Sequence, residues 1–500
     1  MRHVICIFLK DARRLGGLSA LGLALVYGWA ATESWQSDAS PGWLGAGLHP
    51  LVTGVWMLLV ALLVQEDGLV GDRQYWLTRP YSRVGLVLSK ALFVVVFVHG
   101  PYLVACAGVL WARGFAPWEE LGALWERQMM VAGLVTIPSA AVASVTRTFA
   151  QFAGGMLMLA AGGMVLAVGR GPYSLPWLNV DVVRRLAGAM LLGAAGIGVL
   201  AMQYRWRRTG TASVVGFAGV LFTGAVFAWT PALYTEGLGC RLGGVSLMWR
   251  KTETKPDPRA GYVWGRDSYS AQVELRGTAS GEVRHARMLA FSMLGPDGQE
   301  WGLGRSLAAH VETWGTDDER LRVLVGSPVA ESVRGRRVTL RGAFKVDVNV
   351  AKQVERMEIG GPARMVEWVG RCGSVVQSED GFLNRDMLKV FCESPARVPI
   401  LAKVVLRGSG EEIWEQRLGA ASVHYGGWDW LSPLDRKQTF FPIVEGSGTG
   451  SGNKWVVPRA VLAGARVELM PEEPAGCAVV RFETAGVLDG VAGRFVAEVK

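Results

Sequence analysis

Long apolar stretches separated by short polar segments fill the first 235 residues of the chain. About 20 consecutive apolar residues make a helix long enough to cross the hydrocarbon core of a bilayer. The pattern therefore predicts an α-helical polytopic membrane domain over residues 1–235. We expect about seven spans, at residues 15–31, 48–64, 87–110, 129–145, 149–168, 186–204 and 213–234.

From Gly244 onward the apolar positions recur in short runs with the period of two that is typical of strands. Many short strands without helical stretches predict an all-β region of one or two sandwiches. The residues Gly360-Gly361-Pro362 mark a boundary between two β-rich domains, at residues 236–360 and 361–500. The expected strands include residues 271–275, 322–325, 338–341, 344–350, 400–406, 465–469 and 478–482.

The net positive charge lies mainly in the apolar half. Lys and Arg outnumber Asp and Glu by 17 to 10 over residues 1–235, but only by 35 to 33 over residues 236–500. A high pI can indicate nucleic-acid binding, but basic residues beside membrane spans explain this excess, and no nucleic-acid partner is expected.

The distribution of basic residues between the expected spans predicts orientation, because cytoplasmic loops are enriched in Lys and Arg. Twelve basic residues fall on the side of the N-terminus and five on the other side. The N-terminus is therefore expected in the cytoplasm. With seven spans, the C-terminal half is expected outside it, and the expected location is a bacterial cell inner membrane.

The segment between the second and third expected spans carries a helical pattern. Leu69, Arg73 and Trp76 follow helical spacing, and Pro80 ends the helix. This spacing predicts a short amphipathic helix that lies along the inner membrane surface. A polar loop with a basic, membrane-anchoring edge is the alternative.

This segment resembles the one that permeases of the ABC-2 class of ATP-binding-cassette exporters carry between their second and third spans. The matching residues are Glu66, Gly71, Trp76-Leu77, Pro80-Tyr81-Ser82-Arg83 and Lys90. The basic, amphipathic residues 1–14 are similar to that family's interfacial elbow helix. Gln74-Tyr75, a seventh span and the large β-rich half depart from the family pattern.

The resemblance implies a coupling helix that docks onto a separate cytoplasmic ATPase. It also implies pairing with a second copy of the chain or with another permease in the lipid bilayer. The residues that the resemblance assigns to partner binding are Glu66, Gly71, Arg73, Trp76, Pro80, Ser82 and Arg83.

The chain itself carries no sequence signature of an enzyme. A phosphate-binding loop needs Gly-x4-Gly-Lys-Ser/Thr, and the glycine-rich residues 446–452 lack it. No Gly-x-Ser-x-Gly motif and no cysteine or histidine spacing of a zinc site is present. We therefore expect no catalytic residues, no metal and no cofactor, with ATP bound only by a partner subunit.

Four cysteines lie in the β-rich half, Cys240, Cys372, Cys392 and Cys477. Four cysteines in an oxidising compartment allow two disulfides in three pairings. We expect Cys372 to pair with Cys392.

Two features of the membrane half leave alternatives open. No Asp, Glu, Lys or Arg falls in the middle of an expected span, and His99, just before Pro101, is the one titratable candidate for coupling; it serves either helix packing or proton relay. Glycines in the fifth and sixth spans, such as Gly155, Gly193 and Gly196, indicate close helix packing, either within the chain or between subunits.

The sequence therefore predicts the permease-like membrane subunit of an ABC-2 type exporter. The alternative is a membrane protein that transports nothing and anchors an extracytoplasmic β-sandwich for binding or assembly.

Overall fold

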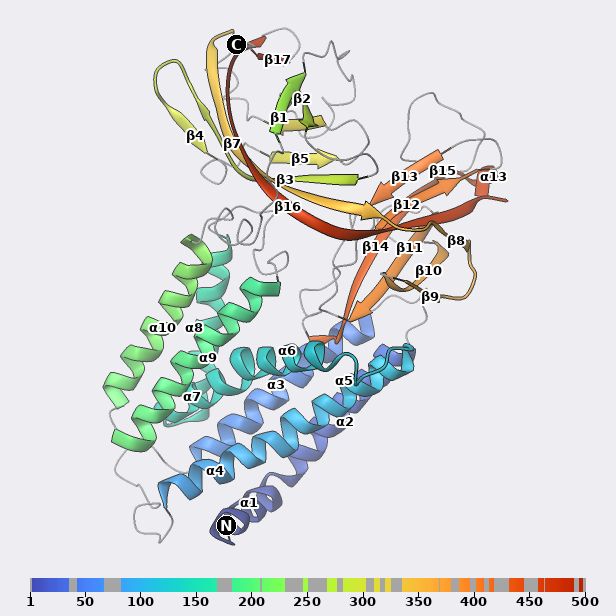
Figure 1. The fold of residues 1–500 in the computed structure, drawn as a ribbon. Coiled ribbons are helices and arrows are strands. Elements are labelled where there is room, and N and C mark those ends of the chain that lie inside the picture. Colours follow the sequence, from blue (N-terminus) through green and yellow to red (C-terminus); the bar gives the residue numbers. More distant parts are fainter. Residues whose placement is uncertain are drawn as a thin grey trace.

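The structure is a computed structural model. It describes residues 2–35, 43–66, 82–168, 182–206, 209–229, 246–250, 268–276, 282–302, 310–314, 320–324, 335–367, 369–378, 386–395, 402–408, 413–417, 431–444, 457–462, 464–489 and 494–497. Helices make up the N-terminal part and strands the C-terminal part, and the two parts lie against each other (Figure 1).

The helical part consists of ten α-helices and three π-helical segments within the described residues. They are α1 (Arg2–Arg14), α2 (Gly16–Trp35), α3 (Trp43–Gln65), α4 (Arg83–Val94), η2 (Val95–His99), α5 (Gly100–Ala112), α6 (Leu121–Val131), η3 (Ala132–Thr136), α7 (Ile137–Val145), α8 (Phe149–Val168), α9 (Val182–Ala201), η4 (Met202–Trp206) and α10 (Thr209–Trp229).

Several of these helices are long and apolar enough to cross a membrane. Four qualify within the described residues, at Gly47–Gln65, Arg83–Ala112, Leu121–Val145 and Leu186–Trp206. A fifth is added if α1 and α2, which meet at a bend of 76°, count as one broken span. The described parts of α8 and α10 contain shorter apolar stretches. The structure thus supports a membrane protein, and the count of seven spans stays a prediction.

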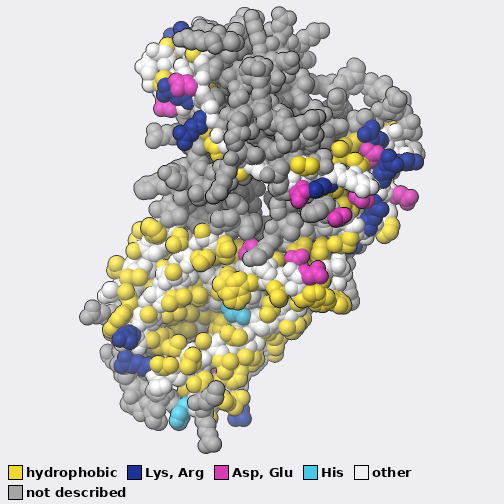
Figure 2. All heavy atoms as spheres, viewed as in Figure 1, with side chains coloured by type: hydrophobic (Ala, Val, Ile, Leu, Met, Phe, Trp, Pro, Cys, Tyr) yellow, Lys and Arg dark blue, Asp and Glu magenta, His cyan; other side chains and the backbone are white. Residues whose placement is uncertain are grey.

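The surface of the helical part suits a lipid environment. Hydrophobic side chains cover its visible face (Figure 2). Trp111, Trp118 and Trp125 are exposed near one end of the helices, and Trp206 is exposed at the other. Tryptophan is enriched where protein surfaces meet lipid headgroups, so this placement is compatible with two interfaces.

The fourth expected span is longer than its apolar residues indicate. The helix runs from Leu121 through η3 to Val145, so it includes Glu126 and Arg127, both of which are buried. The apolar pattern started this helix at residue 129 because polar residues end an apolar run. Here the polar side chains face the protein interior instead of lipid.

Two spans are interrupted in the same way. In one, η2 is followed by Gly100 and Pro101, and in the other η3 is followed by Ile137 and Pro138. Proline lacks the N–H that the preceding turn needs, and a π-helical segment accommodates the missing hydrogen bond within a helix.

Small residues allow the spans to approach closely. A Cβ on Gly133 would lie 2.2 Å from the carbonyl oxygen of Ala189 in α9, and one on Gly196 would lie 2.6 Å from a methyl carbon of Ile137. Gly155 and Gly193 also face neighbouring helices of the same chain, whereas Gly154 and Gly198 have no neighbour within 4 Å. Packing within the chain therefore accounts for Gly155, Gly193 and Gly196 of the expected fifth and sixth spans, and for Gly133 besides.

The described strands form two sheets. The larger has 12 strands, with the path β4-β3-β7-β16-β17-β2-β6-β5 and with β1, β8, β12 and β13 attached. Its strands are β1 (Ser246–Arg250), β2 (Ser268–Arg276), β3 (Glu282–Leu294), β4 (Glu300–Gly302), β5 (His310–Trp314), β6 (Arg320–Leu324), β7 (Arg337–Ala351), β8 (Glu355–Glu358), β12 (Ala402–Arg407), β13 (Ile413–Arg417), β16 (Arg466–Asp489) and β17 (Arg494–Ala497).

The smaller sheet has five strands in the order β15-β14-β11-β10-β9. They are β9 (Arg364–Val366), β10 (Gly370–Ser378), β11 (Asp386–Pro395), β14 (Leu434–Val444) and β15 (Val457–Pro458), and the short helix α13 (Arg459–Leu462) follows β15. One buried cluster joins this sheet to the β8, β12, β13 and β16 part of the larger one, through residues such as Leu388, Phe441, Val404 and Val467. Two sheets that share a core in this way are compatible with a β-sandwich.

The 24-residue strand β16 runs through both β-rich regions (Figure 1). Its first part pairs with β8 and β12, and its later part pairs with β7 and β17. Strands on both sides of the boundary expected at residue 360 therefore share one sheet.

Candidate functional site

The ends of the spans that lie near the N-terminus are held together by polar contacts. We call this the N-end of the helical part, defined by Lys10, Glu66, Arg83, Thr146 and Arg205. Gln65 at the end of α3 donates a hydrogen bond to the hydroxyl oxygen of Thr146, which follows α7. The opposite end, near the β-rich part, is called the sheet end and is defined by Glu33, His49 and Arg113.

Glu66 binds α1 at the N-end. Its Oε1 lies 2.7 Å from Nζ of Lys10 and 2.6 Å from a guanidinium nitrogen of Arg14. Burial by itself would raise the pKa of the Glu66 carboxyl, but the hydrogen bond from Lys10 and the charges of Lys90 and Lys10 outweigh it and hold that pKa below its ordinary value. Glu66 is therefore ionised at neutral pH and fastens α1 to the end of α3.

A second contact fastens α1 to α4. Nζ of Lys90 lies 3.0 Å from a carboxylate oxygen of Asp11, and both side chains are buried. Phe8 packs beside this pair against the rings of Phe93 and Phe97. The amphipathic helix α1 is thus bound to the bundle through an ion pair and an aromatic cluster.

The start of α4 is fixed by the two residues at its N-terminus. The hydroxyl of Ser82 accepts a hydrogen bond from the backbone N–H of Gly85, which caps the helix. Arg83 donates a hydrogen bond of 2.9 Å to the backbone carbonyl of Arg205 in η4. Arg83 therefore links α4 to the end of α9 and η4.

These contacts place three of the seven expected partner-binding residues. Glu66, Ser82 and Arg83 stand at the two ends of the segment that resembles a coupling helix, and each makes a defined contact at the N-end. Gly71, Arg73, Trp76 and Pro80 lie outside the described residues.

At the sheet end, buried charges connect the helices to the five-stranded sheet. Glu33 of α2 accepts a hydrogen bond of 2.7 Å from Arg436 of β14. Arg436 also donates to Glu393 of β11, at 2.9 Å, and the guanidinium of Arg113, which follows α5, lies 3.5 Å from Glu393. Glu33, Arg113 and Glu393 are each no more than 5% exposed.

The same cluster extends within each part. Arg113 donates to the backbone carbonyl of Glu33, and Arg371 of β10 donates to Glu393. The close approach of β10 to Glu393 requires glycine at position 370, because a Cβ there would lie 2.2 Å from the Glu393 carbonyl oxygen and its φ is +109°. The two carboxylates thus bridge three guanidinium groups drawn from both parts.

His49 of α3 also faces this cluster. Trp29 donates its indole N–H to Nε2 of His49 at 2.8 Å, and the same nitrogen lies 3.7 Å from the carboxylate of Glu33. An indole nitrogen only donates, so Nε2 of His49 is the acceptor.

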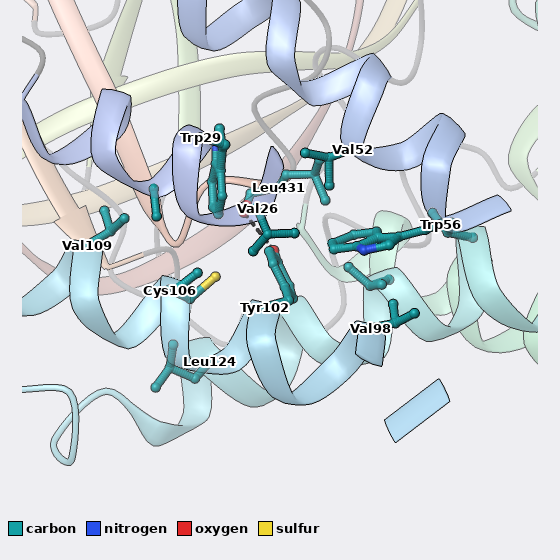
Figure 3. Close-up of a cluster of buried hydrophobic side chains, with 14 of the residues drawn as sticks. Val26, Trp29, Val52, Trp56, Val98, Tyr102, Cys106, Val109, Leu124 and Leu431 are labelled. Atoms are coloured by element: carbon teal, nitrogen blue, oxygen red, sulfur yellow. Dashed lines mark hydrogen bonds between the residues drawn. The ribbon is translucent and has the colours of Figure 1, made fainter. Parts of the chain in front are cut away.

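A loop segment from the β-rich part inserts among the helices beside these charges. The hydroxyl of Tyr102 in α5 donates a hydrogen bond of 2.6 Å to the backbone carbonyl of Leu431, next to the rings of Trp29 and Trp56 (Figure 3). Leu431 and Leu434 are buried in the same cluster as the helix residues. The sheet end therefore joins the two parts by apolar packing as well as by charge.

His99 connects the two interrupted spans. Its Nδ1 lies 2.7 Å from the amide oxygen of Gln128, so Nδ1 carries the proton, and its Nε2 lies 3.4 Å from the hydroxyl of Thr136. Gln128 donates in return to the His99 backbone carbonyl. This mutual arrangement is that of a packing residue which ties η2 to α6 and η3.

Among the predicted cysteines, Cys372 and Cys392 form a disulfide between the paired strands β10 and β11. Cys477 is also disulfide-bonded, and Cys240 lies outside the described residues. Cys6 and Cys106 are free thiols. The described residues hold no group of three or more potential metal ligands.

The charge cluster at the sheet end is a feature that the sequence pattern did not predict. Glu33 and Arg436 are 403 residues apart, and neither stands in a recognisable motif. The signal available in the sequence was Glu33 and His49, which stand at the ends of two apolar runs; ionisable residues in such positions indicate that they pair with other polar groups in the protein interior.

Comparison with known proteins gives no match to a family model, to a curated protein or to a solved structure.

Proposed function

We propose that this chain is the permease-like membrane subunit of an ATP-driven exporter of the ABC-2 type. In this proposal the N-end faces the cytoplasm and the sheet end faces away from it. The described N-end carries Lys10, Arg14, Arg83, Arg147 and Arg205, which agrees with the positive-inside rule. The ATPase is a separate subunit that binds the segment between Glu66 and Ser82.

One observation carries the proposal: both ends of that segment are fastened to helices of the bundle. Glu66 holds its start to α1 and α3, and Ser82 and Arg83 hold its end to α4 and η4. A partner that displaced the segment would therefore move at least four helices together. This is the mechanical property that a coupling segment needs.

The contacts of α1 support the same proposal. An elbow helix on the membrane surface transmits movement only if it is bound to the spans, and α1 is bound to α3 through Glu66 and to α4 through Asp11. Its exposed apolar residues Ile5 and Leu9 suit contact with lipid, and its exposed Arg13 and Arg14 suit contact with headgroups.

The experiment is a purification of the tagged full chain from its native membrane in a mild detergent, with identification of the bound proteins. We expect a stoichiometric ATP-binding-cassette ATPase, retained by Arg147→Glu and lost on Arg83→Glu or Trp76→Ala. Arg147 is the matched control because it is an exposed arginine at the same end of the bundle. An ATPase that binds all variants equally would exclude this segment as its docking site.

The second candidate function is a membrane anchor for an extracytoplasmic binding or assembly domain, without transport. The buried contacts between the helices and the five-stranded sheet favour it, because they fix the β-rich part to the membrane. Recovery of envelope proteins and no ATPase in the same purification would favour this function over the first.

A further inference from the structure

We propose that α2, α3, α5 and the five-stranded sheet form a single lever, so that a displacement of these spans is delivered to the β-rich part. The inference concerns a conformational device and holds for either candidate function. It rests on the contacts at the sheet end and on the N-end contacts that two of these spans, α3 and the span of α4, η2 and α5, carry at their other ends.

The first argument is that residues of two spans, α2 and α5, contact the sheet and that α3 is joined to α2 beside them. Glu33 belongs to α2, His49 and Trp29 connect α3 to α2, and Arg113 follows α5. On the sheet side, Glu393 belongs to β11 and Arg436 to β14, which are neighbouring strands. No single helix bears the connection, so the sheet cannot tilt relative to one span without breaking contacts to the others.

The second argument is the cost of separating the two parts. Glu33 would lose the guanidinium of Arg436, and Glu393 would lose that of Arg113. An uncompensated buried charge is strongly unfavourable, so such pairs stay together or separate only with large rearrangement. The insertion of Leu431 and Leu434 among the helices adds an apolar contact that opposes the same movement.

The third argument is continuity through the membrane part. The helix α3 ends at the N-end beside Glu66, and the span of α4, η2 and α5 begins there with Ser82, Arg83 and Lys90. These two spans therefore connect the contacts of Glu66, Arg83 and Lys90 at the N-end with His49 and Arg113 at the sheet end. A displacement at the N-end is therefore transmitted to the sheet through these two continuous spans.

The test is a distance measurement between two spin labels in the full chain, reconstituted in lipid nanodiscs. One label is attached to a cysteine introduced by Met365→Cys in β9, where Met365 is 53% exposed. The other is attached by Trp118→Cys after α5, where Trp118 is 61% exposed. The exposed thiol Cys6 is replaced by serine in all samples. Because the labels lie on the two sides of the junction, the width of their distance distribution reports how firmly the parts are joined.

We expect one narrow distribution in the unmodified junction and at least a twofold broader one in Glu33→Gln and in Arg436→Gln. The milder Tyr102→Phe, which removes only the hydrogen bond to Leu431, should broaden it less. Arg459→Gln is the matched control, because Arg459 pairs with Asp386 at the opposite end of β11, and it should leave the width unchanged.

A broad distribution in the starting protein, or equal widths in Glu33→Gln, Arg436→Gln and Arg459→Gln, would overturn the lever. The side chain of Arg436 is 35% exposed and that of Glu33 only 5%, so the substitution of Arg436 is less disruptive to folding than that of Glu33. The result does not depend on an ATPase partner, and loss of the ATPase in the purification experiment would leave it unaffected.

Discussion

Lys90 of α4 and Asp11 of α1 form an ion pair of 3.0 Å in which the carboxylate is fully buried and the ammonium nearly so. The pair joins the N-terminal amphipathic helix α1 to the span that begins at Arg83, and its two residues are 79 positions apart in the sequence. Because both groups are buried, each charge is stabilised mainly by the opposite charge of its partner.

Replacing one partner of this pair should therefore cost far more than replacing both. We expect Lys90→Met to lower the free energy of unfolding by about 3–5 kcal/mol, because it leaves a buried carboxylate without its counter-charge. The double variant Asp11→Asn with Lys90→Met should recover most of that loss. Denaturation in a fixed detergent measures both effects, and Lys10→Met, at an exposed position, should stay within about 1 kcal/mol of the starting protein. Equal losses in Lys90→Met and in Lys10→Met would contradict this account.

The contacts of Glu66 should depend on pH. Because its pKa is lower in the folded protein than in the unfolded chain, its contribution to stability is fully present above the unfolded value of about 4.3 and is lost as the pH falls through the folded value. Lys10 and Arg14 are at least half exposed, so we expect only about 0.5–1 kcal/mol from these pairs.

Melting temperatures of the starting protein and of Glu66→Gln, compared at neutral pH and about one pH unit below 4.3, measure this contribution. The difference between the two proteins should be present at neutral pH and should shrink at the acidic pH. A difference that is independent of pH would show that the substitution acts by something other than charge.

Glycine at position 133 should be indispensable for the packing of η3 against α9. Gly133→Ala places a methyl group 2.2 Å from the Ala189 carbonyl oxygen, so we expect a loss of about 1–3 kcal/mol from overpacking. Gly54→Ala in α3, where a Cβ would meet no atom of another element within 4 Å, should be neutral or stabilising by up to about 1 kcal/mol. Thermal denaturation of the two variants gives the comparison, and opposite signs are the expected result.

The Cys372–Cys392 disulfide should stabilise the five-stranded sheet. It closes a loop of 20 residues, for which restriction of the unfolded chain predicts about 3 kcal/mol. The double variant Cys372→Ser with Cys392→Ser should lower the melting temperature of the β-rich part, whereas Cys6→Ser, at an exposed free thiol, should not. The same melting temperature with and without a reducing agent would argue against a stabilising role.

The sequence pattern predicted the parts of the fold in which local residues decide the structure. The apolar run at residues 48–64 became α3, and the alternating run at 271–275 lies within β2. The sequence pattern was less informative where a strand is held by strands that are distant in the sequence. The runs at 465–469 and 478–482 belong to one strand, β16, although Pro471, Pro474 and Gly476 between them normally end a strand. The strand continues there because β12 pairs with it up to Pro471 and β7 pairs with it from Glu472 onward, and an irregularity in register between Pro474 and Gly476 accommodates Pro474.

The candidate site divides in the same way. Ser82 could be expected to cap a helix because serine precedes an apolar run, and it does cap α4. The link between Glu33 and Arg436 could not be predicted, since it depends on how two parts of the chain with different architectures meet. Polar residues buried at such a junction leave no periodic signal.

The long strand β16 sets the order in which the β-rich half can be completed during synthesis. Strand β7 ends at residue 351 and pairs with β3 on one side, but β16, which pairs with its other side, begins only at residue 466. Pairings between segments so far apart in the chain form slowly. The group β4-β3-β7, the pair β12-β13 and the strand β8 therefore stay unconnected, with open strand edges, until β16 (Arg466–Asp489) has been made. A truncation near the C-terminus would remove the centre of the sheet rather than its edge, and its consequences would reach back to strands made more than a hundred residues earlier.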